Sequence, residues 1–246
     1  MAIRAIVFDL FDTLVDLHME NLPRIEFRGR SIPSTAGLLH AAAARHVDVD
    51  FETFAEALVE VDRGFRETRY KLHRELPTEE RFTALCQRLG LPEDELPLLL
   101  TEVHMARLRE QVAVPPHHAE VLGRLRGRVP LGLCSNFSHS ETAERVLALH
   151  GLREPLSAVA ISDEVGLRKP RGEIFDAVLR ALGVEPREAL HVGDSLDADV
   201  SGAAAHGMRT AWITRRVGDP EARLREHAGP RPDWQIGDLA ELLEFV

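Results

Sequence analysis

The feature that most constrains the fold is a series of short apolar runs separated by stretches with helical periodicity. Each run is four to six residues long and apolar nearly throughout, which is typical of strands covered on both faces. The runs are Ile3–Phe8, Pro130–Cys134, Ala158–Ile161, Ala189–Val192 and Thr210–Ile213. Helical spacing lies between the later runs, over Glu141–His150 and Gly172–Leu182. This alternation predicts an α/β fold with a doubly wound parallel sheet.

A stretch of different character separates the first two runs. Its apolar residues recur at helical spacing over 51–61 and 82–89, and Pro23 and Pro115 lie near its ends. We therefore expect a helical domain of residues 17–113, inserted into a core domain of residues 1–16 and 114–246. An insertion after the first strand leaves the sheet at its carboxyl edge, where open α/β sheets bind ligands.

The composition excludes several classes of function. The 30 Lys and Arg against 40 Asp and Glu give a net charge of −10, which disfavours nucleic acid and anionic membranes as partners. No apolar run approaches the ~20 residues that span a bilayer, and Asp9 comes too early for a signal peptide. Two cysteines argue against a disulfide framework. We expect a cytoplasmic protein with a small-molecule substrate.

Two polar motifs follow the first and second predicted strands. Asp9 leaves an apolar strand into a turn, where its carboxylate can attack an electrophile and form an ester. Ser135 and Asn136 end the next strand and can donate hydrogen bonds to an anionic oxygen. The competing interpretations are a turn cap for Asp9 and a helix N-cap for Ser135 or Asn136.

Two further motifs lie later in the chain. Lys169 precedes Pro170 and can neutralise two close negative groups, although a lone lysine is more often a solvated surface residue. Asp194, Asp197 and Asp199 follow the fourth predicted strand. Carboxylates this crowded repel one another unless a cation holds them, and Mg²⁺ suits such a set. The competing interpretation is an acidic loop that caps the next helix, to which we assign Asp197.

Together and in this order, the four motifs resemble those of the haloacid dehalogenase-like hydrolase superfamily. The resemblance covers Ile3–Asp16 and Val114–Val246, and the insertion fits the helical cap of the first cap class. It implies a Rossmann-like core with an inserted α-helical cap domain. It also implies that Asp9 is the nucleophile, that Ser135 and Asn136 bind the transferring group, and that Lys169 stabilises the charge around Asp9.

The resemblance further implies a Mg²⁺ site. Asp9 and Asp194 would be its carboxylate ligands, the main-chain carbonyl of Phe11 would be a third ligand, and Asp199 would support the metal or a bound water. The metal would shield the repulsion between the carboxylate and a substrate phosphate.

The first motif departs from the phosphatase pattern. Phe11 stands where phosphatases of this superfamily carry a second Asp that protonates the leaving group, and Asp12 follows one residue later. That acid is worth roughly 10²–10⁴-fold in rate. Asp12 is a candidate replacement, although neighbouring side chains in a turn point in different directions. An aromatic residue at position 11 resembles the metal-independent 2-haloacid dehalogenases, whereas the Gly-Asp-Ser setting of Asp194 resembles the phosphatases.

Three functional hypotheses follow. The leading one is a Mg²⁺-dependent phosphatase that acts on a small phosphorylated metabolite through an aspartyl-phosphate. The second is a 2-haloacid dehalogenase with an aspartyl-ester intermediate, and the third is a catalytically weak binding or regulatory member. We expect a monomer or homodimer.

Two predictions concern surface residues. Arg63, Arg66, Tyr70 and Arg74 could share one helical face toward an anionic substrate. The favoured alternative is a solvent face with ion pairs such as Lys71–Glu75. The 12 histidines show no metal-ligand spacing and are interpreted as surface and capping residues.

Overall fold

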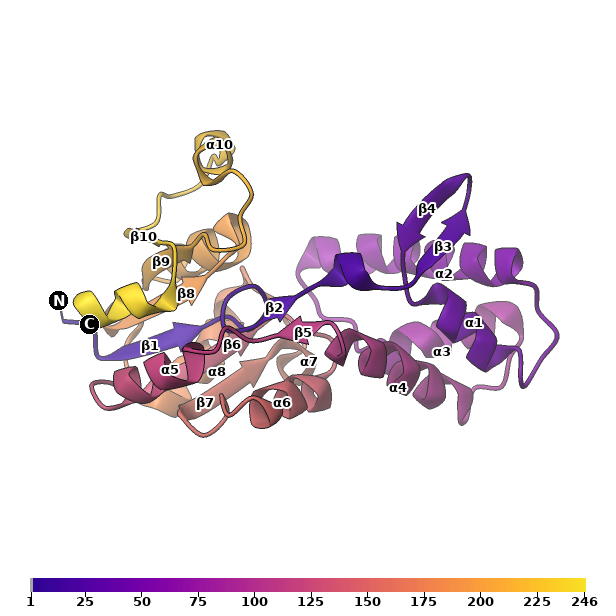
Figure 1. Ribbon diagram of the computed structural model, residues 1–246, viewed down its shortest axis with the longest axis horizontal. Coiled ribbons are helices and arrows are strands. Elements are labelled where there is room, and N and C mark those ends of the chain that lie inside the picture. Colours follow the sequence, from indigo (N-terminus) through magenta and orange to yellow (C-terminus); the bar gives the residue numbers. More distant parts are fainter. Residues whose placement is uncertain (1) are drawn as a thin grey trace. The chain divides into compact units, whose positions relative to one another are not determined.

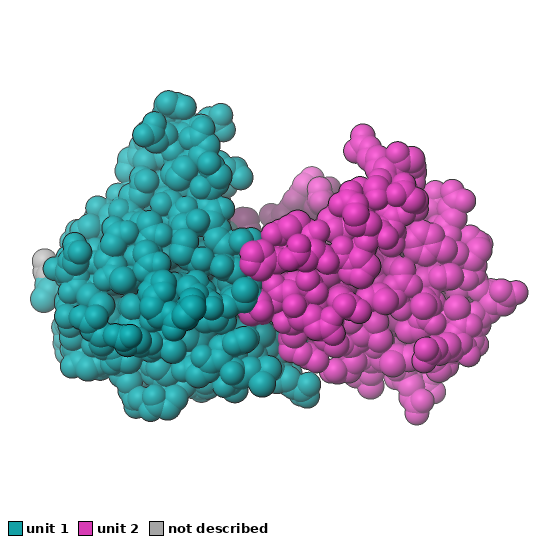
Figure 2. All heavy atoms as spheres, viewed as in Figure 1, with its two compact units in different colours: residues 1–16, 113–246 teal, residues 17–112 magenta. Residues whose placement is uncertain are grey.

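The computed structural model describes residues 2–246 and consists of two compact units. Figure 2 colours them separately: of the described residues, one unit contains 2–16 and Ala113–Val246, and the other contains Leu17–Val112. Figure 1 shows that the first unit carries a central sheet, and that the second is built mainly from helices. The chain passes between the units along β2 (Asp16–Leu17) and β5 (Val112–Ala113), which pair with each other.

The first unit is built on a six-stranded parallel sheet in the order β10-β9-β8-β1-β6-β7. Its strands are β1 (Ala5–Phe8), β6 (Leu131–Ser135), β7 (Leu156–Ile161), β8 (Ala189–Gly193), β9 (Arg209–Ile213) and β10 (Trp234–Ile236). Every residue of β1, β6 and β8 is buried. The predicted α/β fold with a doubly wound parallel sheet is therefore confirmed. The three-residue β10 was not predicted, because it is too short to show a pattern.

Helices flank this sheet, and α8 shows how they are held. The helices are α5 (His118–Arg126), α6 (Ser140–Leu149), α7 (Ser162–Val165), α8 (Gly172–Leu182), α9 (Gly202–Ala205) and α10 (Pro220–Glu226). The apolar face of α8, with Ile174, Phe175 and Val178, packs in one cluster with Val7 and Cys134 of the sheet. Such burial is the main stabilising contribution to a fold of this kind. Short helical turns cover Pro186–Glu188, Leu196–Ser201 and Leu239–Glu244.

The second unit contains four helices and a hairpin. The helices are α1 (Ala36–Ala43), α2 (Phe51–Thr68), α3 (Thr78–Leu89) and α4 (Leu96–Arg109), with helical turns at Met19–Asn21 and Tyr70–Leu72. Phe54, Phe82 and Leu100 lie in their common core. The hairpin of β3 (Arg24–Phe27) and β4 (Arg30–Pro33) differs from the helical prediction. Exposed and half-buried residues alternate in β3, and every residue of β4 is exposed, so both strands lack the apolar run that marks a buried strand.

The common helical face of Arg63, Arg66, Tyr70 and Arg74, which was the less favoured of the two interpretations, is not formed. Helix α2 ends at Thr68, and Tyr70 lies in a separate helical turn. Arg74 lies beyond that turn, after His73, whose φ of 51° breaks the helical path. Arg63 and Arg66 alone belong to α2.

The predicted Lys71–Glu75 ion pair is also wrong. Lys71 pairs instead with Glu67, at 2.6 Å. Glu75 is buried and accepts a hydrogen bond from the backbone N–H of Leu76 at 2.8 Å. The helix ends before residue 75, so the four-residue spacing no longer brings the two side chains together.

No helix within residues 2–246 has the length and hydropathy that crossing a bilayer requires.

Two glycine-to-alanine substitutions should have opposite effects on stability. An added Cβ at Gly132, in β6, would lie 2.7 Å from Val178 Cγ2 and 2.9 Å from Leu182 Cδ1. Gly132→Ala should lower the free energy of unfolding by about 1–3 kcal/mol, because the added methyl group would overpack the core at this position. Gly123, in α5, has no such neighbour within 4 Å. Gly123→Ala should raise the free energy of unfolding by about 0.5–1 kcal/mol.

Urea unfolding of both variants beside the parent protein measures the difference. Equal stabilities for the two variants would contradict the packing described for β6 and α8.

Candidate active site

The predicted site residues lie at one edge of the central sheet. Asp9 directly follows β1, Ser135 ends β6, and Asp194 directly follows β8. Because β1 lies between β6 and β8 in a parallel arrangement, the carboxyl ends of these strands meet. The backbone N–H of Asp9 donates to the carbonyl of Val192 at 2.9 Å, which continues the pairing to the base of the site.

Lys169 lies at the centre of the charged groups. Its Nζ is 2.6 Å from Asp9 Oδ1 and 2.6 Å from Asp199 Oδ1. The residue is only 3% exposed. Burial by itself would lower the pKa of Lys169, but the two carboxylates outweigh burial and hold that pKa above its ordinary value. Lys169 is therefore a buried ammonium that bridges two carboxylates, and the surface interpretation is wrong.

The side chain of Asn136 positions Lys169. Its Oδ1 accepts a hydrogen bond from the backbone N–H of Lys169 at 2.7 Å, and its Nδ2 donates to the Lys169 carbonyl at 3.0 Å. Both ends of the amide are therefore bound to the Lys169 backbone. The helix-cap interpretation is wrong, because His139 provides the N-cap of α6 through a bond from Thr142 N.

Asp199 is held by three donors. Its Oδ1 accepts from Lys169 Nζ and from His191 Nε2, at 2.9 Å for the histidine, and its Oδ2 accepts from Ser195 N at 2.9 Å. Burial would raise its pKa, but Lys169 and His191 outweigh burial and hold the pKa of Asp199 below its ordinary value. An added Cβ at Gly193 would lie 2.2 Å from Asp199 Cγ, so this close approach requires glycine.

The sequence analysis interprets the histidines as surface and capping residues, and this is wrong for two of them. His191 lies in β8 and is 1% exposed, and His118 is fully buried. Burial lowers the pKa of His191, even though Asp199 opposes that effect. The apolar run that contains His191 was the available signal, since a histidine within a buried strand must itself be buried.

Three carboxylates converge in a way that suits a divalent cation. Asp9, Asp194 and Asp199 each offer an oxygen within 4.8 Å of the other two. Burial is the main reason why the pKa of Asp9 rises to about 6, although Lys169 opposes it. Burial and repulsion from Asp9 and Asp199 raise the pKa of Asp194 to about 8. The site therefore holds more negative charge than Lys169 neutralises.

Ser135 offers a buried hydroxyl beside these charges. The residue is 1% exposed, and its Oγ has no hydrogen-bond partner among residues 2–246. A buried polar atom without a partner is costly, and a substrate oxygen could supply the missing bond.

Phe11 and Asp12 make contacts with residues outside the four motifs. The ring of Phe11 packs against the ring of Phe137, with 4.6 Å between the centroids. Asp12 has a φ of 58°, and its Oδ1 accepts a hydrogen bond from Arg216 Nε at 2.8 Å. The ion pair therefore joins the Asp12 carboxylate to a side chain more than 200 residues away.

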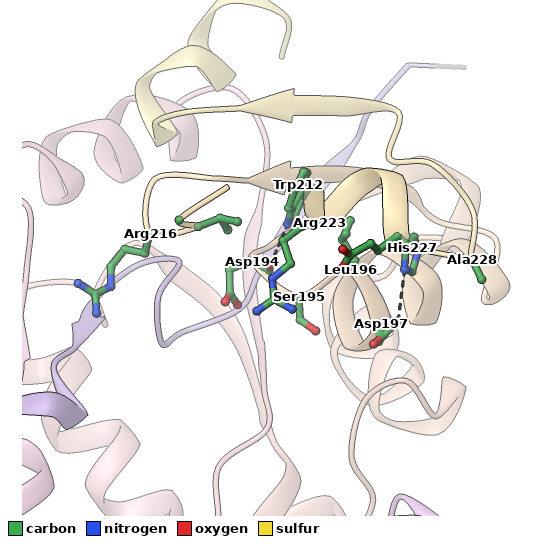
Figure 3. Close-up of a pocket in the computed structure, with 12 residues that line it drawn as sticks. Asp194, Ser195, Leu196, Asp197, Trp212, Arg216, Arg223, His227 and Ala228 are labelled. Carbon is green, nitrogen blue, oxygen red and sulfur yellow. Dashed lines mark hydrogen bonds and ion pairs between the residues drawn. The ribbon is translucent and has the colours of Figure 1, made fainter. Parts of the chain in front are cut away.

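A pocket of about 460 Å³ adjoins Asp194 within the same unit. Figure 3 shows its wall, formed by the 194–197 loop, Trp212 and residues of the 216–228 segment. The indole Nε1 of Trp212 donates to the carbonyl of Asp194 at 2.7 Å and so anchors the loop. Asp197 does not provide the predicted cap: Ser195 caps the following helical turn, and the Asp197 side chain is 93% exposed and lies 3.3 Å from His227.

Sequence reasoning did not identify Trp212 and Arg216 as neighbours of the site. Each reaches it from the far end of the chain and shows no motif of its own.

The chain was compared with known proteins. A family model described as haloacid dehalogenase-like hydrolase matches residues 3–207. A glyceraldehyde 3-phosphate phosphatase of Pyrococcus abyssi is 32% identical over 219 residues, covering 86% of this chain and 81% of the relative. An (S)-2-haloacid dehalogenase of Pseudomonas sp. strain YL is 27% identical over 250 residues, covering 99% and 94%. Two other matched phosphatases are covered over less of their length: 60% of a phosphoserine phosphatase of Thermus thermophilus and 43% of a glyceraldehyde 3-phosphate phosphatase of Methanopyrus kandleri.

A solved structure shows the same fold. The crystal structure of a 2-haloacid dehalogenase from Pseudomonas syringae pv. Tomato DC3000 matches with a TM-score of 0.72 at 22% sequence identity. The match covers 99% of this chain and 97% of that chain.

Removing the charge of Asp194 should stabilise the protein when divalent cations are chelated. An ordinary Asp has a pKa of 3.8, whereas that of Asp194 is about 8. The unfolded chain therefore releases this proton from about pH 4, and the folded chain releases it only near pH 8. Stability from this group is complete below about pH 4 and is lost as the pH rises toward 8. Asp194→Asn should therefore be more stable than the parent at about pH 8, by on the order of 1–3 kcal/mol.

Thermal unfolding of Asp194→Asn and of the parent protein in EDTA, between about pH 5 and pH 9, measures this difference in stability. Asp197→Asn is the control, because its side chain is largely exposed, and it should keep the parent's pH dependence. Identical pH profiles for Asp194→Asn and the parent would contradict the charge crowding described above.

Proposed function

Because the chain belongs to the haloacid dehalogenase-like hydrolase family, we propose that it is a Mg²⁺-dependent phosphatase of a small phosphorylated metabolite. The observation that carries this proposal is the convergence of Asp9, Asp194 and Asp199 around the Lys169 ammonium. A phosphatase relative that is covered over most of its length supports the same conclusion. We further propose that residues 17–113 serve as a cap that selects the substrate.

The donor set fits Mg²⁺, which prefers carboxylates, water and substrate phosphate oxygens. Asp9 and Asp194 would hold the ion, together with the main-chain carbonyl of Phe11. The pKa values of Asp9 and Asp194 are raised to about 6 and about 8, chiefly by burial and in addition by neighbouring carboxylates. A divalent cation would neutralise the charge of their ionised forms. When bound, the ion would neutralise charge on the phosphate oxygens. Asp199 has three donors of its own, so its proposed role is to hold Lys169 and the 194–199 loop.

In the first step, an oxygen of the Asp9 carboxylate attacks the substrate phosphorus. A bond forms between that oxygen and phosphorus, and the bond from phosphorus to the leaving oxygen breaks with its electron pair. The leaving group departs as an alkoxide or phenoxide, which takes up a proton from solvent water. Lys169 and the Ser135 hydroxyl stabilise the negative charge on the transferring group.

In the second step, water attacks the phosphorus of the aspartyl-phosphate. The bond between phosphorus and Asp9 breaks, inorganic phosphate leaves with the oxygen from water, and the Asp9 carboxylate is restored. Lys169 remains protonated throughout and does not serve as the acid, since its two carboxylate partners favour its charged form.

Loss of the nucleophile or of the cation should abolish phosphatase turnover. Asp9→Asn should lower kcat by on the order of 10⁴-fold or more, because an amide cannot replace the carboxylate as the nucleophile and the supporting groups cannot act without it. EDTA should reversibly suppress the activity of the parent protein. Phosphate release from p-nitrophenyl phosphate and from a panel of metabolite phosphates measures both effects, with Asp176→Asn as a surface control. Activity that persists in EDTA or in Asp9→Asn would contradict the proposal.

Because position 11 carries no acid, the turnover rate should depend strongly on how basic the leaving oxygen of the substrate is. Aryl phosphates release a weakly basic oxygen and need little protonation, whereas alkyl phosphates need a proton donor. Phe11→Asp should therefore raise turnover of alkyl phosphates by up to roughly 10²–10⁴-fold relative to aryl phosphates. Asp12→Asn should leave the ratio unchanged, because the Asp12 carboxylate is paired with Arg216.

The opposite result, in which Asp12→Asn loses alkyl phosphate turnover and Phe11→Asp gains none, would assign the acid role to Asp12.

A second candidate is hydrolysis of a carbon–halogen bond in a short 2-haloacid. The Phe11–Phe137 ring pair favours it, because an apolar wall suits a halide that leaves without a proton. Here Asp9 would attack the halogen-bearing carbon, the carbon–halogen bond would break to release halide, and water would hydrolyse the ester. Halide release from 2-chloropropionate in EDTA would select this function over the phosphatase. Turnover of neither substrate class would favour a binding or regulatory role.

A further inference from the structure

A second group of metal-ligating side chains lies in the sheet-bearing unit, outside the carboxylate cluster. His117 and His118 stand at the start of α5, and Asp238 precedes the helical turn Leu239–Glu244. Each of the three offers a ligand atom within 4.8 Å of the other two. None of them contacts Asp9, Asp194 or Lys169.

His118 is oriented as a metal ligand would be. Its Nδ1 lies 2.8 Å from the carbonyl of Leu14. A carbonyl can only accept, so Nδ1 carries the proton and Nε2 carries the lone pair. The imidazole is fully buried, and Nε2 has no hydrogen-bond partner among residues 2–246. A backbone carbonyl that fixes the far nitrogen of a histidine is a recurring feature of metal sites.

Asp238 faces both histidines. Its carboxylate lies 2.8 Å from His117 Nε2, and its Oδ2 lies 4.0 Å from the unpartnered His118 Nε2. The backbone N–H of Ala240 donates to Asp238 Oδ1 at 2.8 Å, which fixes the carboxylate. The side chains of His117 and Asp238 are 45% and 31% exposed, so an ion could reach the group from solvent.

We propose that His117, His118 and Asp238 form a second metal site, which binds a divalent transition metal of the Zn²⁺ type. Two imidazoles and one carboxylate are the ligands such ions prefer, whereas Mg²⁺ prefers oxygen ligands alone. Binding would replace the His117–Asp238 hydrogen bond with bonds from both residues to the metal, and it would give His118 Nε2 the partner it lacks.

One neighbouring charge opposes a cation at this site. The Arg215 guanidinium acts electrostatically on His118. Arg215 forms a two-bond ion pair with Asp16, one bond of which measures 2.9 Å, so its charge is largely neutralised. The balance of the local charges therefore permits a cation beside Asp238.

The site would join three separate parts of the unit. His118 bonds to Leu14, five residues after Asp9, and Asp238 begins the last helical turn of the chain. A metal there would link α5, the loop after β1 and the C-terminal segment, and it would stabilise the folded unit by mass action.

The experiment uses the full chain with Asp9→Asn and Asp194→Asn as background, so that the carboxylate cluster no longer competes for metal. After chelation, the protein is titrated with Co²⁺ and followed by visible absorption, and thermal unfolding is measured with and without Zn²⁺. We expect one ion per chain and a rise in Tm of roughly 5–10 °C at ~100-fold excess of free Zn²⁺ over Kd. Excess Mg²⁺ should not remove the shift.

Two histidine variants decide the assignment. His117→Gln should lose both the Co²⁺ absorption and the Tm shift, and its half-exposed position leaves the fold intact. His206→Gln is the matched control, because His206 also pairs with a carboxylate at 2.8 Å, that of Asp176, but belongs to no three-ligand group among residues 2–246. It should keep both signals. Equal metal binding by His117→Gln and the background protein, or no binding by the background protein, would overturn the proposal.

Discussion

The structure of the site depends on one buried ammonium. Lys169 bridges Asp9 and Asp199 at 2.6 Å to each, almost without exposure to solvent. Burying three charges costs several kcal/mol per ion, and only short contacts with further hydrogen bonds offset that cost. Those further bonds are present: Asn136 fixes the Lys169 backbone, and His191 and Ser195 complete the shell of Asp199. Loss of either carboxylate would leave the Lys169 charge incompletely compensated.

The parallel sheet makes this arrangement possible. Strands β6, β1 and β8 are neighbours in space although more than a hundred residues separate β1 from β6. Their carboxyl ends present Ser135, Asp9 and Asp194 at one edge. The approach of Asp199 then requires a residue without a side chain at Gly193. Sheet topology thus brings the residues together, and close packing decides which of them touch.

The two candidate reactions place opposite demands on this site. Dehalogenation needs no cation, yet Asp194 stands beside two other carboxylates. Burial, and then repulsion from those carboxylates, raises the pKa of Asp194 to about 8. An ionised carboxylate in that position destabilises the folded protein when no cation is bound, and it would help to bind a cation when one is present. Phe11 favours the other reaction, because its ring occupies the place of an acid. The phosphatase proposal rests on this electrostatic argument from three carboxylates, and the dehalogenase alternative rests on the single aromatic contact.

The sequence by itself determined the parallel α/β sheet, because strands buried on both faces must be apolar throughout. It also indicated Asp9, Ser135 and Asp194, because each ends or follows a strand, and it indicated Lys169 because that residue completes the series of four motifs. Only the tertiary structure decided that Asn136 holds the Lys169 backbone, that His118 and His191 are buried, and that Asp12 pairs with Arg216. These outcomes depend on partners far away in the chain, and local periodicity carries no record of which distant side chain fills a given contact. The hairpin β3–β4 and the end of α2 at Thr68 escaped prediction for a different reason: partly exposed segments lack the apolar pattern by which buried elements are recognised.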